Sequence, residues 1–340
     1  MKIFEEYSIK NLLLRNRIVM PPMCMFQAGI DGLVTQKHFV HYVTRAVGGV
    51  GLIIVEATAV SPEGRIEQKD LGIWNENQKN GLKTIVSECH QYGAKMALQL
   101  AHAGRKGFDG VNIVAPSALA FNSDYATPHE LTKQEILNKV DDFKAAALRA
   151  VQAGFDMIEV HAAHGYLIHE FLSPLTNKRT DEFGGSLENR VRFLKLILEG
   201  IREVIPAGVP LEMRISASDY DKDGIDVHEI VKIINQVKKY LDLVHVSSGG
   251  LTEHPVKSYT GYQVEFSRII KEQCNLPTIA VGLIDEPDLA EEIVENGRAD
   301  LVALGRALLR NPYWVLNAAH AEKQDHFIPK MYERGFRGFK

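Results

Sequence analysis

The chain has 340 residues, of which 45% are hydrophobic and 24% charged, and its formal net charge is −4. This composition is typical of a globular protein with a large buried core and excludes disorder as its main state. Without a polybasic run, the acidic balance also argues against nucleic acid or an anionic membrane as partner, so we expect a small-molecule or protein partner.

Cysteine usage and the N-terminus indicate the compartment. Cys24, Cys89 and Cys274 are widely spaced and odd in number, which fits reduced thiols better than a disulfide framework. The chain becomes acidic at Glu5 and Glu6, where a signal peptide would be apolar, and its longest apolar stretch, residues 47–60, is interrupted by glycines and an acid. We therefore expect a cytoplasmic protein that is not inserted in a membrane.

Eight short β-rich runs recur along the chain, each bounded by glycine, proline or charge. They are residues 17–20, 52–55, 96–99, 157–160, 211–215, 243–246, 278–281 and 301–304. Several lack polar alternation, as expected of parallel strands that are covered on both faces.

Segments with helical periodicity lie between these runs and carry start signals. The expected N-caps are Asn75, Thr132, Asp226 and Asp285, with Glu135 and Glu229 completing capping boxes after Thr132 and Asp226. Strand and helix thus alternate eight times without a linker, which favours an α/β fold, a (β/α)8 TIM barrel.

The barrel is predicted as one domain over residues 1–340, with residues 331–340 as a C-terminal tail and a strand pair within residues 2–14 closing one end. Long loops are expected after strand three, from residue 100 to about 132, and after strand four, from residue 161 to about 186. A doubly wound dinucleotide fold is the competing architecture. It needs a glycine-rich turn after a strand, whereas the glycines of residues 48–51 precede one.

Barrel enzymes carry their chemistry where the strands end, so the residues at these points are candidates for the site. In chain order they are Pro21, Pro22, Met23 and Cys24; Glu56 and Ala57; Gln99; His161, His164 and Tyr166; Arg214; Gly282; and Gly305 with Arg306. Glycines after strands seven and eight with an arginine beside them are typical of a phosphate site, although Gly282 and Gly305 could equally make tight turns.

His161 and His164 allow two interpretations. With His169 they could ligate a metal, but no acidic residue completes a familiar ligand set. Alternatively, two neutral imidazoles could donate N–H bonds to one substrate oxygen, with Tyr166 as a nearby proton donor. Arg214 needs a negative partner, which could be Glu56 or a bound anionic cofactor ring.

Residues 154–174, GFDMIEVHAAHGYLIHEFLSP, resemble the old yellow enzyme family. The likeness extends over nearly the whole chain through PMCM at 22–25, QLAHAGRK at 99–106, APS at 115–117 and RISA at 214–217, which are similar to the bacterial branch typified by NADPH dehydrogenases.

This resemblance implies noncovalently bound FMN, reduced by NADPH, that delivers hydride from its N5 to the C=C bond of an α,β-unsaturated carbonyl or a nitro compound. It further implies that His161 and His164 hold the substrate oxygen and that Tyr166 supplies the proton. The implied flavin contacts are Pro21, Pro22, Met23, Cys24, Ala57, Gln99 and Arg214, with Gly282, Gly305 and Arg306 at the phosphate end. No metal is implied.

Two positions depart from the family pattern. Phe26 stands in the substrate pocket where the branch usually has tyrosine, and Pro21 where it usually has serine or threonine. Branch members also insert a tail arginine into a neighbouring subunit, so the resemblance implies a homodimer or homotetramer with Arg334 in the partner's site, Arg337 being a rival.

Other functions were weighed against this one. A metal-dependent barrel hydrolase would use His161 and His164, and an RNA-binding protein would use the arginine- and aromatic-rich residues 334–339. Larger dienoyl-CoA reductases share the barrel but add a second half with a cysteine-ligated cluster, for which this chain lacks the length and the cysteines.

Overall fold

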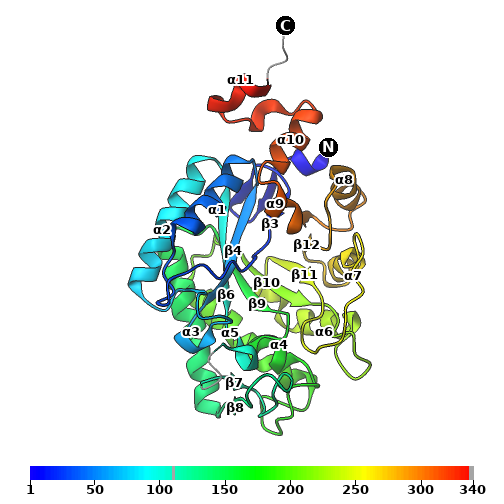
Figure 1. The fold of residues 1–340 in the computed structure, drawn as a ribbon. Helices are drawn as coiled ribbons and strands as arrows, with labels where there is room; N and C mark the ends of the chain where they lie inside the picture. The colour runs from blue at the N-terminus through cyan, green and yellow to red at the C-terminus, as the bar shows by residue number, and fades with distance from the viewer. Residues whose placement is uncertain (109–111, 337–340) are drawn as a thin grey trace.

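The computed structural model describes residues 1–108 and 112–336, and within them eight parallel strands close into a barrel (Figure 1). Around the barrel these are β3 (Ile18–Met20), β4 (Leu52–Ala59), β6 (Lys95–Ala101), β9 (Met157–Ala162), β10 (Leu211–Ser216), β11 (Leu243–Ser247), β12 (Thr278–Ala280) and β13 (Leu301–Ala303). Strand β13 pairs with β3 and closes the circle, while β5 (Leu71–Gly72) extends β4 on the outside. The predicted strands and the TIM barrel are confirmed.

Helices form the outer layer of the barrel (Figure 1). They are α1 (Gln36–Val47), α2 (Glu76–Gln91), α3 (Lys133–Gln152), α5 (Leu187–Val204), α6 (Val227–Val237), α7 (Val264–Cys274), α8 (Pro287–Glu295), α9 (Arg306–Arg310) and α10 (Trp314–Ala321). The two predicted long loops carry the small sheet β7 (Val114–Ala115) with β8 (His129–Glu130), and α4 (Leu167–Leu172). The last described element is α11 (Glu333–Phe336), which lies with the N-terminus at the opposite end of the molecule from β7 and β8 (Figure 1).

Two of the predicted helix starts are confirmed in full and two need correction. Capping boxes open α2 and α3. Asp226 does cap α6, but the Glu229 carboxylate binds Arg190 at 2.7 Å and does not close a box.

The predicted cap of α8 is wrong. Its N-cap is Glu286, without a side-chain bond, because Asp285 is used elsewhere: its carboxylate pairs with Arg310 at 2.7 Å and its carbonyl accepts from Trp314 at 2.7 Å.

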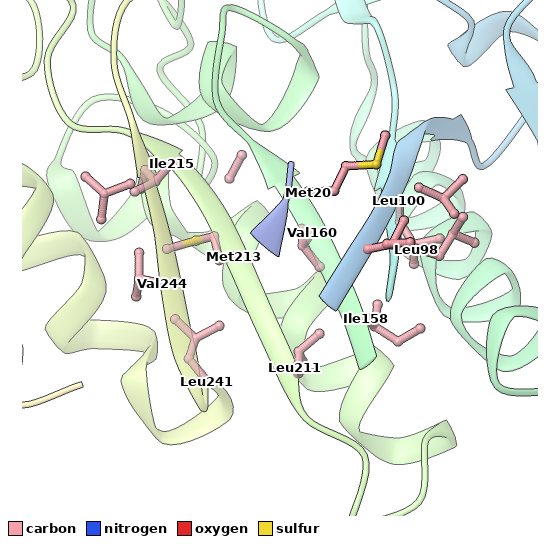
Figure 2. Packing of buried hydrophobic residues seen from close by; sticks show 14 of the residues in the cluster. Met20, Leu98, Leu100, Ile158, Val160, Leu211, Met213, Ile215, Leu241 and Val244 are labelled. Atoms are coloured by element: carbon pink, nitrogen blue, oxygen red, sulfur yellow. The ribbon is translucent and has the colours of Figure 1, made fainter. Parts of the chain in front are cut away.

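Side chains on the outer face of the strands are apolar and pack against the helices. Figure 2 shows this layer for neighbouring strands, with labelled residues Leu98, Leu100, Ile158, Val160, Leu211, Met213, Ile215 and Val244. The residues between them in sequence face the barrel interior. His245 of β11 contacts Glu159 of β9 across the intervening β10, which is possible only on the concave face. Strands β6, β9 and β10 therefore alternate apolar outward and polar inward in their upper halves.

One end of the barrel is closed by the N-terminal strand pair, β1 (Tyr7–Ile9) and β2 (Leu12–Leu14), as predicted. Their buried side chains, Ile9, Leu12 and Leu14, pack against inner residues of the strands. Those inner residues are Val19, Leu52, Ile54, Ala97, Met157, Leu243, Ile279, Leu301 and Ala303. The lower half of the interior is thus an apolar plug, and the open end lies at the carboxyl ends of the strands.

Among the described residues, none of the helices combines the length and the apolar character that a bilayer crossing requires.

Candidate functional site

His161 and His164 lie side by side at the end of β9. Their rings meet edge to face with centroids 5.2 Å apart, and Nε2 of His161 lies 3.5 Å from Nδ1 of His164. The backbone N–H of Ala163 donates to Nδ1 of His161 at 3.3 Å, so a neutral His161 carries its proton on Nε2. The Ser247 hydroxyl lies 2.7 Å from Nε2 of His164 and 3.3 Å from Oε1 of Gln263, and its single proton can go to either. In the tautomer in which His164 accepts from Ser247, its own proton is on Nδ1, 3.5 Å from Nε2 of His161, and both ring N–H groups can be directed at one atom.

The two imidazoles are held in the neutral form. Burial lowers the pKa of both His161 and His164 well below the usual range, and the nearby charge of Arg214 lowers it further. Two neutral N–H groups directed at one point can bind a single oxygen atom and stabilise negative charge that develops on it.

Tyr166 stands at the N-cap of α4, and its ring lies 5.1 Å from that of His161. The ammonium of Lys106 lies over the tyrosine ring at 4.8 Å and donates to the carbonyl of His164 at 2.8 Å. Burial raises the pKa of the Tyr166 hydroxyl, so the phenol keeps its proton at neutral pH. Lys106 belongs to a sequence motif noted above, but the sequence assigned it no role.

His169 points away from this pair. Its Nδ1 accepts from the backbone of Gly165 at 3.0 Å, and its Nε2 contacts the carboxylate of Asp219 at 2.8 Å. A metal site of His161, His164 and His169 is therefore not assembled. Among residues 1–108 and 112–336, the three-residue group with ligand atoms close enough to share an ion is instead Glu159, Glu212 and His245.

Arg214 enters the barrel mouth close enough to Glu159 and Glu212 for their charges to act on it, but its guanidinium is only weakly hydrogen-bonded. It is 9% exposed, its nearest recorded acceptor is the carbonyl of Pro22 at 3.4 Å, and its buried Nε has no acceptor among the described residues. Glu56 as its partner is wrong, because that carboxylate accepts from the Met25 backbone at 2.8 Å and from the Tyr42 hydroxyl at 2.9 Å. A buried guanidinium that lacks an acceptor in the mouth fits the anionic or carbonyl edge of a bound ring.

The segment after β3 lies along the mouth. The thiol of Cys24 is partly exposed, faces the backbone N–H of Ala57, and has a raised pKa, chiefly because of burial. Pro21 and Met23 pack beside Gly305, since a Cβ on that glycine would lie 3.8 Å and 3.7 Å from them.

Phe26 ends this segment with a φ of 53° and is 37% exposed. Positive φ is costly for an aromatic residue, and the hydrogen bond from the Met25 backbone to Glu56 helps to hold this segment.

Gly282, Gly305 and Arg306 line one cavity of about 150 Å³. Arg214, Ser247, Tyr262 and Gln263 line it as well, so this cavity joins the predicted phosphate end to the mouth. Backbone at two glycines with an arginine on each side suits a phosphate and the chain attached to it. A larger cavity of about 760 Å³ lies among Glu63, His129 and Lys139 and contains none of the predicted site residues.

Two predicted residues are placed outside this group. Gln99 is buried below the mouth and donates its amide to Glu159 at 2.6 Å. Arg334 is exposed on α11, where Phe336 packs on His320, so it is not brought to the site of its own chain. The rival Arg337 lies outside the described residues.

The sequence places Ser247 at the end of the sixth strand but assigns it no role, and it does not point to the interior group of Glu159, Glu212 and His245. A signal was present, since polar residues at every second position of residues 211–214 and 157–161 mark an inward face in strands that are otherwise apolar.

Comparisons with known proteins can be set against this geometry. A family model described as the NADH:flavin oxidoreductase / NADH oxidase family matches residues 2–325. The chain is 57% identical over 339 residues to an NADPH dehydrogenase of Clostridium acetobutylicum, covering 99% of this chain and 100% of the relative. It is 48% identical over 337 residues to an NADPH dehydrogenase of Bacillus subtilis, covering 98% and 99%.

Solved structures give a matching picture. Morphinone reductase superimposes with a TM-score of 0.81 and 29% identity, over 94% of this chain and 89% of that one. A 2-naphthoyl-CoA reductase complex gives a TM-score of 0.88 and 27% identity over 95% of this chain, but this chain spans only 52% of that longer protein.

Proposed function

Because the chain belongs to the NADH:flavin oxidoreductase / NADH oxidase family, we propose that it reduces the C=C bond of α,β-unsaturated carbonyl compounds and of nitro compounds. The protein is an oxidoreductase with FMN as cofactor and NADPH as electron donor. FMN bound at this mouth would supply hydride transfer from NADPH to the alkene.

The residues around the mouth fit this cofactor. Arg306 and the backbone at Gly282 and Gly305 would hold the phosphate, and Arg214, whose buried Nε lacks an acceptor among the described residues, would face the ring and favour its anionic reduced form. Pro21, Pro22, Met23, Cys24 and Ala57 would lie along the ring. Gln99 reaches this region from below, with its amide nitrogen engaged by Glu159.

The convergence of two neutral imidazole N–H groups supports the reaction type best. We assign the point between His161 and His164 to the substrate oxygen, which gains negative charge when hydride reaches the β-carbon. Tyr166 lies next to His161 and keeps its proton, so it is the donor to the α-carbon.

The flavin absorbance of the purified protein and its rate of NADPH oxidation test the proposal. The purified protein is expected to carry one noncovalent FMN per chain and to oxidise NADPH in the presence of enones, maleimides or nitroalkenes, with less activity from NADH. A colourless protein that gains no flavin absorbance when titrated with FMN would rule it out.

We also propose that the protein is a cytoplasmic homodimer or homotetramer, built from single barrel domains over residues 1–340, with Arg334 entering a neighbour's site. The exposure of Arg334 on α11, away from its own mouth, supports this arrangement. Deleting residues 331–340 should weaken enone binding and leave FMN bound. Mixing the truncated chain with a His161→Ala chain should restore part of the activity, whereas full activity of the truncated chain alone would contradict the shared site.

A further inference from the structure

A group of polar side chains is buried inside the barrel, one layer below Arg214. Gln99, Glu159 and Glu212 are in register on the neighbouring strands β6, β9 and β10. Glu159 accepts from Gln99 at 2.6 Å through one oxygen and contacts Nδ1 of His245 at 2.8 Å through the other. All of these side chains are sealed from solvent, with Glu159, Glu212 and His245 at 0% exposure.

Glu212 differs from Glu159 in having no donor. Neither of its carboxyl oxygens has a hydrogen-bond partner among the described residues, although Glu159 and His245 place ligand atoms within 4.8 Å. Two ionised carboxylates this close in a sealed interior repel each other, and each also loses its hydration. A proton held between them removes one charge and provides the missing hydrogen bond.

We propose that Glu159 and Glu212 share one proton beneath Arg214, and that this one-proton pair sets how strongly the Arg214 charge favours reduced over oxidised FMN. The second half of this inference rests on the proposed function, whereas the shared proton does not.

The surroundings decide which member of the pair is ionised. Glu159 receives two hydrogen bonds and is the ionised member, while Glu212 holds the proton. Burial raises the pKa of Glu212 well above its usual range, and the neighbouring Glu159 charge raises it further. Arg214 is thus opposed by a single negative charge.

The groups that face the pair are few. Arg214 lies above it on β10, His245 on β11, and His161 above Glu159 on β9. The pKa of His245 and of His161 is lowered, mainly by burial, so both are neutral. Two residues below Gln99, Glu159 and His245 on the same strands lie the apolar Ala97, Met157 and Leu243.

A divalent cation is the alternative occupant, because two carboxylates and an imidazole are a possible ligand set. Arg214 already supplies a positive charge to the same group, and a second cation beside it would be repelled. The apolar plug also closes the lower end. These observations favour the proton.

Infrared spectroscopy of the oxidised holoenzyme at neutral pH tests the shared proton. Glu212→Gln and Glu159→Gln should each remove the same protonated-carboxyl band. Loss of a carboxylate band from Glu212→Gln, or one divalent ion per chain in elemental analysis that disappears in that variant, would overturn the proposal. The infrared result is independent of the proposed function, because it can be obtained even if the protein does not reduce alkenes.

The midpoint potential of bound FMN tests the second half. Glu212→Gln replaces one neutral group by another and should change the ratio of affinities for reduced and oxidised FMN by less than threefold. The double variant Glu159→Gln/Glu212→Gln leaves Arg214 unopposed and should raise that ratio at least tenfold, about 30 mV for a two-electron couple. A rise of the same size in Glu212→Gln alone would show that Glu212 is ionised and would sink the proposal.

Glu170→Gln is the matched control. Glu170 is also fully buried, with one oxygen unpartnered and a pKa raised to about 8 by burial, but it lies on α4 outside the barrel. It should lose its own infrared band and leave the potential unchanged. If the double variant does not fold, the infrared bands and the midpoint potential of Glu212→Gln still decide whether Glu212 holds the proton.

Discussion

The lower and upper halves of the barrel interior are built from the same strands, but the lower half is apolar and the upper half carries buried polar groups. In the lower half, Leu14 and Met157 are fully buried and pack against the apolar side chains of the plug. In the upper half, His161, Arg214 and Glu212 are nearly as buried, yet two of them retain polar atoms without partners. The first arrangement minimises the free energy of the folded chain, whereas the second leaves groups that only a ligand or a proton can satisfy.

Within a single strand, some residues contribute to the stability of the fold and others to the reaction. On β9, Met157 belongs to the plug and His161, four residues later on the same inward face, belongs to the mouth. Substitutions in the plug are therefore expected to change the free energy of unfolding, and substitutions in the mouth to change reaction steps.

The largest expected effect is in the plug. Leu14→Ala removes a side chain with 0% exposure and should lower the free energy of unfolding by about 2–5 kcal/mol, because it leaves a cavity. Leu13 is the control, since it is adjacent, 47% exposed, and should change stability by less than about 0.5 kcal/mol when replaced by alanine. Urea denaturation measures both, and equal losses would refute the assignment of the plug.

Tyr166→Phe tests the upper half of the barrel, where a substitution should change a reaction step. It should slow reoxidation of the flavin by an enone about a hundredfold or more, since a positioned proton donor is lost. Reduction of the flavin by NADPH needs no proton from this residue and should be unchanged. Stopped-flow absorbance separates the two half-reactions, and equal slowing of both would show that the tyrosine positions the flavin or nicotinamide.

His161→Ala removes one of two donors to the substrate oxygen. Alkene reduction should fall on the order of a hundredfold. The exposed His129, substituted in the same way, is the control and should leave turnover unchanged. Wild-type rates from the His161 variant would place the substrate oxygen elsewhere.

Protonation of Glu56, which lies beside the mouth, should make the free energy of unfolding depend on pH. Burial raises the pKa of Glu56 to about 7, above the usual range of a glutamate, so the folded protein binds a proton more tightly there than the unfolded chain does. Its contribution to stability is present below the unfolded pKa and is lost as pH rises through about 7. The stability of the wild type relative to Glu56→Gln should therefore fall on the order of 2 kcal/mol between mildly acidic and mildly alkaline pH. Urea denaturation at both pH values measures this, and a constant difference would contradict the raised pKa.

The smallest effect is expected at the phosphate end. Arg306→Ala should weaken FMN binding about tenfold, because one charge-assisted hydrogen bond is lost. Arg310 lies on the same short helix but pairs with Asp285, so Arg310→Ala should bind FMN nearly as the wild type does. Fluorescence titration of FMN compares the two, and similar losses would place the phosphate elsewhere.

The sequence by itself determined the barrel and its open end. Unbroken apolar runs that alternate with capped helices are local features, and the eight strands follow from them. The polar residues at the strand ends also had to meet, because parallel strands end on the same face. His161, His164, Arg214 and Gly305 were found in this way, and the predicted Asp285 cap was wrong because Arg310 and Trp314 bind that residue from elsewhere in the chain.

Only the tertiary structure decided which buried polar side chains pair with one another. Periodicity cannot show that Glu56 binds Tyr42 and the Met25 backbone and does not pair with Arg214, since these contacts join distant segments. It also cannot tell that Glu159 and Glu212 end up in register across two strands, because register depends on how all the strands pack around one plug. The charges that tune the site are set by burial, and burial is a property of the assembled barrel.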